Sequence, residues 1–309
     1  MSERRLSRHA IGRIEVVAAA AGYGFLGVFG KQAYAAGLGP GEFLTMRFVA
    51  AAAILWVYVL VARRSALVWD RRKIAACAAL GVFGYALFTS LYFHALKDLS
   101  ASLTSLLLYT FPVMVTIAAR VLFGEPIGWK RGVALPIVAA GLVMLLWGDI
   151  TVHNWVAVAL GLGSAVFYST YILASSRWLR GVDSMIAGLY IMTAAAIALF
   201  AIAHPSIEQL RGLDARAWTA VAGIALVSTL GPLVLFLRGL EKLSSPEASI
   251  LSLVEPMTAV LSATVLLGER LSFVQVLGGA IILGAMALST SRPARPDSPD
   301  PAPPSTALQ

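Results

Sequence analysis

Apolar residues occur in ten runs of about 20 residues, separated by short segments that carry most of the charged side chains. A helix of that length crosses the roughly 30 Å hydrocarbon core of a bilayer. Strands of a membrane barrel are excluded because the runs are about twice too long and do not alternate. The ten predicted helices occupy residues 14–35, 42–62, 74–96, 100–122, 129–147, 155–176, 184–203, 215–239, 245–267 and 272–290.

The composition points to the same class of protein. Hydrophobic residues make up 59% of the chain and charged residues 13%, and the mean hydropathy is +0.80. Soluble globular domains have about 25% charged residues, so this chain lacks the polar surface to cover itself in water. A soluble enzyme and a disordered chain are therefore excluded. We predict an all-α polytopic membrane protein.

The net charge of +8 does not indicate a nucleic-acid partner, because the basic residues lie in short clusters between the apolar runs. If the N-terminus is cytoplasmic, 18 of the 24 lysines and arginines fall on the cytoplasmic side and six on the other side. This bias predicts that both termini face the cytoplasm, as an even number of helices requires. The expected location is the plasma membrane, which in a bacterium is the inner membrane, with the lipid bilayer as surroundings.

The two ends of the chain differ from the apolar middle. Residues 1–13 are expected to form a cytoplasmic N-terminal segment, and no cleavable signal peptide is evident because the first apolar run is too long. Residues 291–309 contain six prolines among small polar residues, so we predict a disordered tail. The single cysteine, Cys77, cannot form an internal disulfide and is interpreted as a small packing residue.

An internal repeat is the most informative feature of the sequence. Residues 96–125 match residues 240–269 at a constant offset of 144. The matched residues are Leu96 and Leu240, Leu99 and Leu243, Ser100 and Ser244, Pro112 and Pro256, and Gly124-Glu125 and Gly268-Glu269. Two five-helix units follow, at residues 14–148 and 149–290. Because five is odd, the second unit enters the membrane from the opposite side, and such inverted repeats are typical of secondary transporters.

The repeated segments also resemble a known family. The stretch Tyr92-Phe93-His94-Ala95-Leu96, with Pro112 and Gly124-Glu125 after it, is similar to the EamA module of the drug/metabolite transporter superfamily. The second copy, from Gly239-Leu240 through Glu255-Pro256 to Gly268-Glu269, resembles it too, as do Lys31 and Met46-Arg47-Phe48. Tyr23-Gly24 departs from the Trp-Gly of many members. The resemblance implies a small-molecule carrier, with export as the expected direction, and specifies no substrate.

Three residues within the predicted helices are candidates for hinge motion or for charge recognition. Pro112 and Pro256 lie at equivalent depths, lack an N–H, and free the carbonyls of the residues four positions earlier, Leu108 and Ser252. We predict that both are hinges for gating. Glu255 is the repeat partner of Phe111 and is a candidate for proton coupling, for binding a substrate ammonium, or for capping backbone groups at the kink.

Two basic residues lie nearer the outer ends of the first two predicted helices. Lys31 and Arg47 are possible charge partners of a substrate carboxylate, although snorkelling to the interface or an ion pair is the favoured interpretation.

Aromatic and hydroxyl side chains form stripes along three predicted helices. Tyr85, Tyr109, and the pair Tyr168 and Tyr171 recur at helical spacing with small residues, and a polar stripe facing lipid is costly. These faces should turn inward, although ordinary helix packing explains any one stripe nearly as well. The predicted substrate-binding set is Tyr85, Tyr109, Phe111, Tyr168, Tyr171, Ser252 and Glu255.

Motifs for catalysis or for resident cofactors are missing from the sequence. The four histidines are scattered, and neither a Walker loop nor a nucleophile elbow occurs. We therefore expect a non-enzymatic secondary transporter without metal or cofactor, able to act as a monomer, that exports small amphipathic metabolites by alternating access. Amino acids are the favoured substrates. The alternatives are a multidrug efflux carrier for hydrophobic cations and a non-transporting scaffold or sensor.

Overall fold

A computed structural model describes residues 7–35, 38–67, 70–99, 101–146, 154–203, 214–267 and 272–290. Every regular element in these ranges is helical. In the first half of the chain the elements are α1 (Arg8–Tyr23), α2 (Leu26–Ala35), α3 (Pro40–Ala62), η1 (Arg64–Ala66), α4 (Arg71–Ala79), η2 (Leu80–Ala86), α5 (Leu87–Asp98), α6 (Ala101–Leu108), α7 (Phe111–Phe123) and α8 (Trp129–Leu145). In the second half they are α9 (Trp155–Trp178), α10 (Ser184–Ala203), α12 (Ala215–Ala225), η3 (Leu226–Leu230), α13 (Gly231–Leu240), α14 (Ser245–Leu251), α15 (Val254–Leu267) and α16 (Phe273–Thr290).

Within the described residues, seven helical stretches are long and apolar enough to cross a membrane. They are Gly41–Ala62, Arg71–Leu96, Leu103–Phe123, Trp155–Trp178, Ser184–Ala203, Trp218–Leu240 and Ser245–Leu266. Each coincides with one of the predicted ranges to within three residues at either end, so the prediction of an all-helical polytopic membrane protein is confirmed. Shorter helices occupy the other three ranges, with α1 and α2 in the first, α8 in the fifth and α16 in the last.

Polar side chains set where several of these helices begin. Asp70 accepts a hydrogen bond from the Arg72 N–H (2.9 Å) at the start of α4. Asn154 accepts one from the Val156 N–H (2.9 Å) at the start of α9. A cap of this kind replaces one of the backbone partners missing from the first turn, which favours a helix that starts at that point.

Several of the membrane helices are interrupted. Two of the breaks lie beside the predicted proline kinks, and the others were not predicted from the sequence. Two-residue breaks at Tyr109–Thr110 and at Ser252–Leu253 separate α6 from α7 and α14 from α15. The first predicted helix is not continuous, because a turn at Gly24–Phe25 separates α1 from α2. In addition, η2 and η3 are π-helical segments. Such segments concentrate at functional sites because they redirect side chains and backbone carbonyls.

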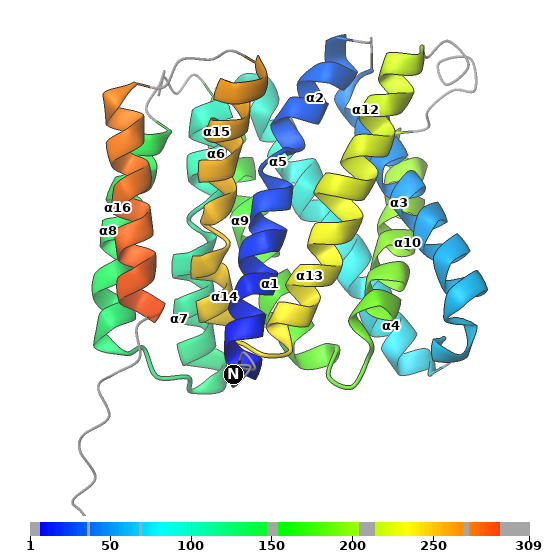
Figure 1. Cartoon of the computed structure of the whole chain (residues 1–309), viewed down its shortest axis with the longest axis horizontal. Helices are drawn as coiled ribbons and strands as arrows, with labels where there is room; N and C mark the ends of the chain where they lie inside the picture. The colour runs from blue at the N-terminus through cyan, green and yellow to red at the C-terminus, as the bar shows by residue number, and fades with distance from the viewer. Residues whose placement is uncertain are drawn as a thin grey trace, which may run out of the picture.

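The principal helix pairs each join one half of the chain to the other. The pairs are α3 with α10, α8 with α16, α5 with α9 and α1 with α13. Figure 1 shows the α8–α16 pair at one edge, α3 and α10 towards the other, and α1, α5, α9 and α13 between them. One continuous hydrophobic core includes residues from all four pairs. The interior is therefore formed between the halves.

The first described helix begins, and the last described helix ends, at the same face of the molecule. In Figure 1, α1 begins and α16 ends at the lower face, which we call the N-terminal face. The ends of α3, α7, α9 and α13 lie at this face as well.

Candidate functional site

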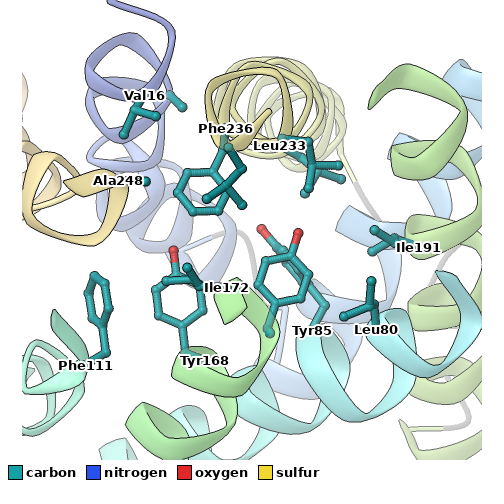
Figure 2. Packing of buried hydrophobic residues seen from close by; sticks show 14 of the residues in the cluster. Val16, Leu80, Tyr85, Phe111, Tyr168, Ile172, Ile191, Leu233, Phe236 and Ala248 are labelled. Carbon is teal, nitrogen blue, oxygen red and sulfur yellow. The ribbon is translucent and has the colours of Figure 1, made fainter. Parts of the chain in front are cut away.

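Five aromatic side chains that the sequence predicts for the site form one buried cluster. The ring centroid of Tyr168 lies 4.8 Å from that of Phe111 and 6.2 Å from that of Tyr171. Tyr171 in turn lies 5.4 Å from Tyr85, and Tyr109 lies 6.4 Å from Phe111. All five are buried. Figure 2 shows Tyr85, Tyr168 and Phe111 on one side and Phe236 of α13 across from them. The structure thus brings together residues from α7, α9, η2 and the break before α7.

The local structure explains how three different segments present these rings. Tyr168 and Tyr171 are about one turn apart on the continuous helix α9. Tyr85 lies on the π-helical segment η2. Tyr109 and Phe111 flank the break before α7, where Pro112 is the second helical residue and its missing N–H leaves no hydrogen bond unmade. The structure places Pro112 at a break, and its role as a hinge remains a prediction.

Glu255 lies at the equivalent break in the second half. It is the second residue of α15, and Pro256 follows it. The Tyr109 hydroxyl is within hydrogen-bonding reach of the Glu255 carboxyl. The side chain of Arg47 is close enough to act on that carboxyl electrostatically. A carboxylate in a membrane interior costs several kcal/mol unless it is paired, protonated or hydrated, and these two neighbours are placed to offset part of that cost.

Ser252 lies at the break before α15, and both of its polar groups have partners. Pro256 frees the Ser252 carbonyl, and this carbonyl accepts the Glu255 N–H at 3.0 Å instead. Its hydroxyl donates to the Ala248 carbonyl at 3.0 Å. The carbonyl therefore finds its replacement partner within the chain, because the helix tightens at the break. Whether Ser252 binds substrate remains a prediction.

Arg47 is the clearest difference between expectation and structure. Its side chain is only 2% exposed, so snorkelling to the interface is wrong for this residue. The Nε atom donates to Thr229 Oγ1 at 2.6 Å, and Nη2 donates to the Ser228 carbonyl at 3.2 Å. The guanidinium carbon lies 5.1 Å from the Phe48 ring centroid. A buried guanidinium needs such partners, and η3 supplies them. The Lys31 side chain lies outside the described residues.

The internal repeat relates the two π-helical segments to each other. At the 144-residue offset Tyr85 corresponds to Thr229, and the five residues of η3 correspond to the last five of η2. Sequence reasoning missed Ser228 and Thr229. The repeat gave a signal for Thr229, since its partner Tyr85 belongs to the predicted site. The buried Ser228 hydroxyl has no hydrogen-bond partner in the described part of the chain, so the residue whose carbonyl binds Arg47 also carries an unsatisfied polar atom.

Tyr23-Gly24 closes the site from the first helix. The Tyr85 hydroxyl donates to the Tyr23 hydroxyl across 3.1 Å. Gly24 packs directly against α15, where an added Cβ would lie 2.5 Å from the Thr258 Cβ and 2.9 Å from the Glu255 carbonyl oxygen. The absence of a side chain at Gly24 therefore lets the turn between α1 and α2 approach Glu255.

The site has the components of a binding pocket for an amphipathic solute. It holds one buried cation, Arg47, and one acid, Glu255, near aromatic rings with hydroxyl groups. These residues offer recognition of charge and of apolar surface. Among the described residues no group of three His, Cys, Asp or Glu side chains is placed to hold a metal ion.

Comparison with known proteins identifies the family. The model of the EamA-like transporter family matches residues 10–147 and again residues 155–291. The chain belongs to the EamA-like transporter family. An uncharacterized transporter of Bacillus subtilis, YcbK, is 27% identical over 80% of this chain and 82% of its own length. An uncharacterized transporter of Archaeoglobus fulgidus is 28% identical over 68% and 74%.

One further relative and one solved structure are similar to this EamA-like chain. The uncharacterized inner membrane transporter YedA of Escherichia coli is 27% identical over 79% of both chains. A solved crystal structure superimposes with a TM-score of 0.77 at 20% identity, covering 90% of this chain and 96% of the other. The EamA-like chain is thus an integral membrane protein of a transporter family, and its fold recurs in a solved structure.

Proposed function

We propose that this protein is a secondary transporter of the inner membrane that exports small amphipathic metabolites, with amino acids as the favoured substrates. The observation that carries this proposal is the presence of a buried arginine, Arg47, and an acid, Glu255, near one buried aromatic cluster of an EamA-like transporter. An amino acid carries a carboxylate, an ammonium and a side chain of variable polarity. The site offers a partner for each of these three parts.

Each group has a distinct role in the proposed binding mode. The substrate carboxylate binds the Arg47 guanidinium, which η3 holds in place, and the Ser228 hydroxyl. The substrate ammonium binds Glu255. The side chain of the substrate lies among the rings of Tyr85, Tyr168 and Phe111, whose contacts tolerate different apolar shapes. Such a solute neutralises both buried charges at once.

The proposed architecture is ten membrane helices in two inverted five-helix units with both termini in the cytoplasm. It is supported by the two matches to the family model, by principal helix pairs that join the two halves, and by the common face at which α1 begins and α16 ends. In alternating access, the helix breaks preceding Pro112 and Pro256 act as the gating hinges. No catalytic step and no resident cofactor is required.

The test is solute counterflow in liposomes containing the purified protein. A panel of labelled amino acids is screened with and without a pH gradient. Glu255→Gln should abolish flux while leaving the monodisperse protein peak and the thermal midpoint intact, and Glu255→Asp should retain part of the flux because it keeps the charge. Unchanged flux in Glu255→Gln removes the role of Glu255. No flux for any solute would favour a non-transporting scaffold or sensor.

A multidrug carrier for hydrophobic cations is the second candidate. It is favoured by the position of Glu255, a membrane-embedded acid beside the Tyr109 ring, since aromatic faces and carboxylates both attract cations. The nearby Arg47 disfavours it through charge repulsion. Competition decides between the two, because hydrophobic cations should inhibit flux strongly only if they share the site.

A further inference from the structure

A cavity opens at the N-terminal face, apart from the aromatic cluster. Its volume is about 980 Å³, and it is lined where α9 ends, where α10 begins and where α13 ends. None of the aromatic residues of the cluster lines it. A cavity of this size can admit a small metabolite.

The cavity walls carry an excess of positive charge. Six basic side chains and three acidic ones line it, so the formal net charge is +3. The basic residues are Arg8, Arg63, Arg177, Arg180, Arg238 and Lys242, and the acidic residues are Glu125, Asp183 and Glu241.

The acidic residues of the wall are already engaged. Asp183 pairs with Arg63 at 3.2 Å and Glu125 with Arg177 at 3.0 Å, while Glu241 accepts a hydrogen bond from the Ser184 hydroxyl.

Two of the cations remain without an acidic partner in the described part of the chain, namely Arg8 and Arg180. Both are exposed. Arg238 and Lys242 differ, since both bind Glu15, at 3.0 and 2.6 Å. A concave surface with walls of one dominant sign focuses the electrostatic field and concentrates ions of the opposite sign. The occupant expected on these grounds is an anion.

The floor of the cavity adjoins the aromatic cluster. Ser175 lines the cavity and lies four residues after Tyr171 on the same helix, a rise of about 6 Å. On α13, Leu237 lines the cavity, and its neighbour Phe236 faces Tyr168 in Figure 2. A solute held in this cavity is therefore one helical turn from the proposed binding site.

We infer that this cavity is an entry vestibule that binds the anionic group, carboxylate or phosphate, of solutes approaching from the N-terminal face. The idea rests on the proposed function where it concerns transport, but anion binding is testable without transport. The alternative explanation is that these cations only set the orientation of the chain in the membrane. Orientation requires charge on this face, whereas binding requires charge at the cavity.

The binding test uses inorganic phosphate as the probe. Purified protein in neutral detergent is titrated with phosphate at constant ionic strength, and the thermal midpoint is followed. We expect saturable stabilisation that weakens about fivefold in Arg180→Gln. Arg72→Gln is the matched control, because Arg72 is exposed at the start of α4 and does not line the cavity. Equal weakening in both variants, or no saturation in the wild type, overturns the inference.

Two further arms identify the occupant. In nanodiscs, replacing part of the zwitterionic lipid with phosphatidylglycerol should leave the phosphate affinity within twofold, and a large loss would assign the cavity to lipid headgroups instead.

In liposomes, Arg180→Gln should raise KM about threefold for an amino acid identified by counterflow, without changing the maximal rate. That difference should vanish at about 0.5 M salt, where screening acts within a few ångströms. A lower maximal rate with unchanged KM contradicts an entry role. Absent flux with intact phosphate binding refutes the transport proposal alone.

Discussion

The crossing of α8 and α16 depends on a glycine, which gives a sharp test of the packing. A Cβ atom at Gly278 would lie 2.4 Å from the Leu145 backbone nitrogen and 2.6 Å from the Gly141 carbonyl oxygen. Both atoms belong to the backbone of α8, so no side-chain rotation can relieve the overlap. Small residues of this kind let membrane helices approach closely. Gly278→Ala should therefore push the two helices apart.

The expected cost follows from comparing two opposing effects. Alanine favours a helix over glycine by up to about 1 kcal/mol, which would stabilise the variant. Ordinary contacts of a Cβ begin near 3.4 Å, so the helices must separate by roughly 1 Å, and overpacking of this kind costs about 1–3 kcal/mol. The cost of overpacking should exceed the gain in helix propensity. Gly278→Val should destabilise the protein further, because its two extra methyl groups would overlap the same segment of the α8 backbone.

Thermal unfolding of detergent-purified protein provides the measurement. Gly284 on the same helix is the matched control, because an added Cβ there meets no atom within 4 Å. Gly284→Ala should leave the midpoint unchanged or raise it, whereas Gly278→Ala should lower it. Equal midpoints for the two variants would refute the close crossing of α8 and α16.

Three further predictions concern the charged and aromatic groups. Arg47→Lys should raise KM in counterflow by about tenfold without loss of folded protein, because lysine keeps the charge but not the fork that reaches Thr229 and the Ser228 carbonyl. Tyr85→Phe should lower the free energy of unfolding by about 1 kcal/mol in denaturant titrations, because it removes the 3.1 Å bond to Tyr23; no change would show that bond to be neutral. Glu247→Gln should cost about 1–2 kcal/mol, since this buried acid binds Arg13 at 2.8 Å, and the loss should exceed that of Glu125→Gln at a more exposed pair.

Much of the fold could be predicted from the sequence because hydrophobic length is nearly sufficient to define a membrane helix. Seven predicted ranges contain helices of spanning length. The breaks at Tyr109–Thr110 and Ser252–Leu253 lie next to the paired prolines that predict them. The π-helical segments were not predictable in this way, since they depend on packing and on hydrogen bonds between helices and leave no local signature.

The candidate site was predictable for residues that form stripes along one helix. Tyr85, Tyr109, Tyr168 and Tyr171 lie at helical spacing with other polar or small residues, and all four reach the cluster. The burial of Arg47 was not predictable, because its partners on η3 lie about 180 residues away in sequence. A long basic side chain near a helix end snorkels by default, and only the tertiary contacts with η3 overcome that tendency.

The helix pairs have a consequence for how the chain reaches its folded form. Every principal pair takes one helix from residues 10–147 and one from residues 155–291, so much of the core lies between the halves. The two halves therefore resemble two subunits joined by a peptide connection, which raises their effective concentration. Two separately encoded halves, inserted into the same membrane, would have to find each other before either became stable.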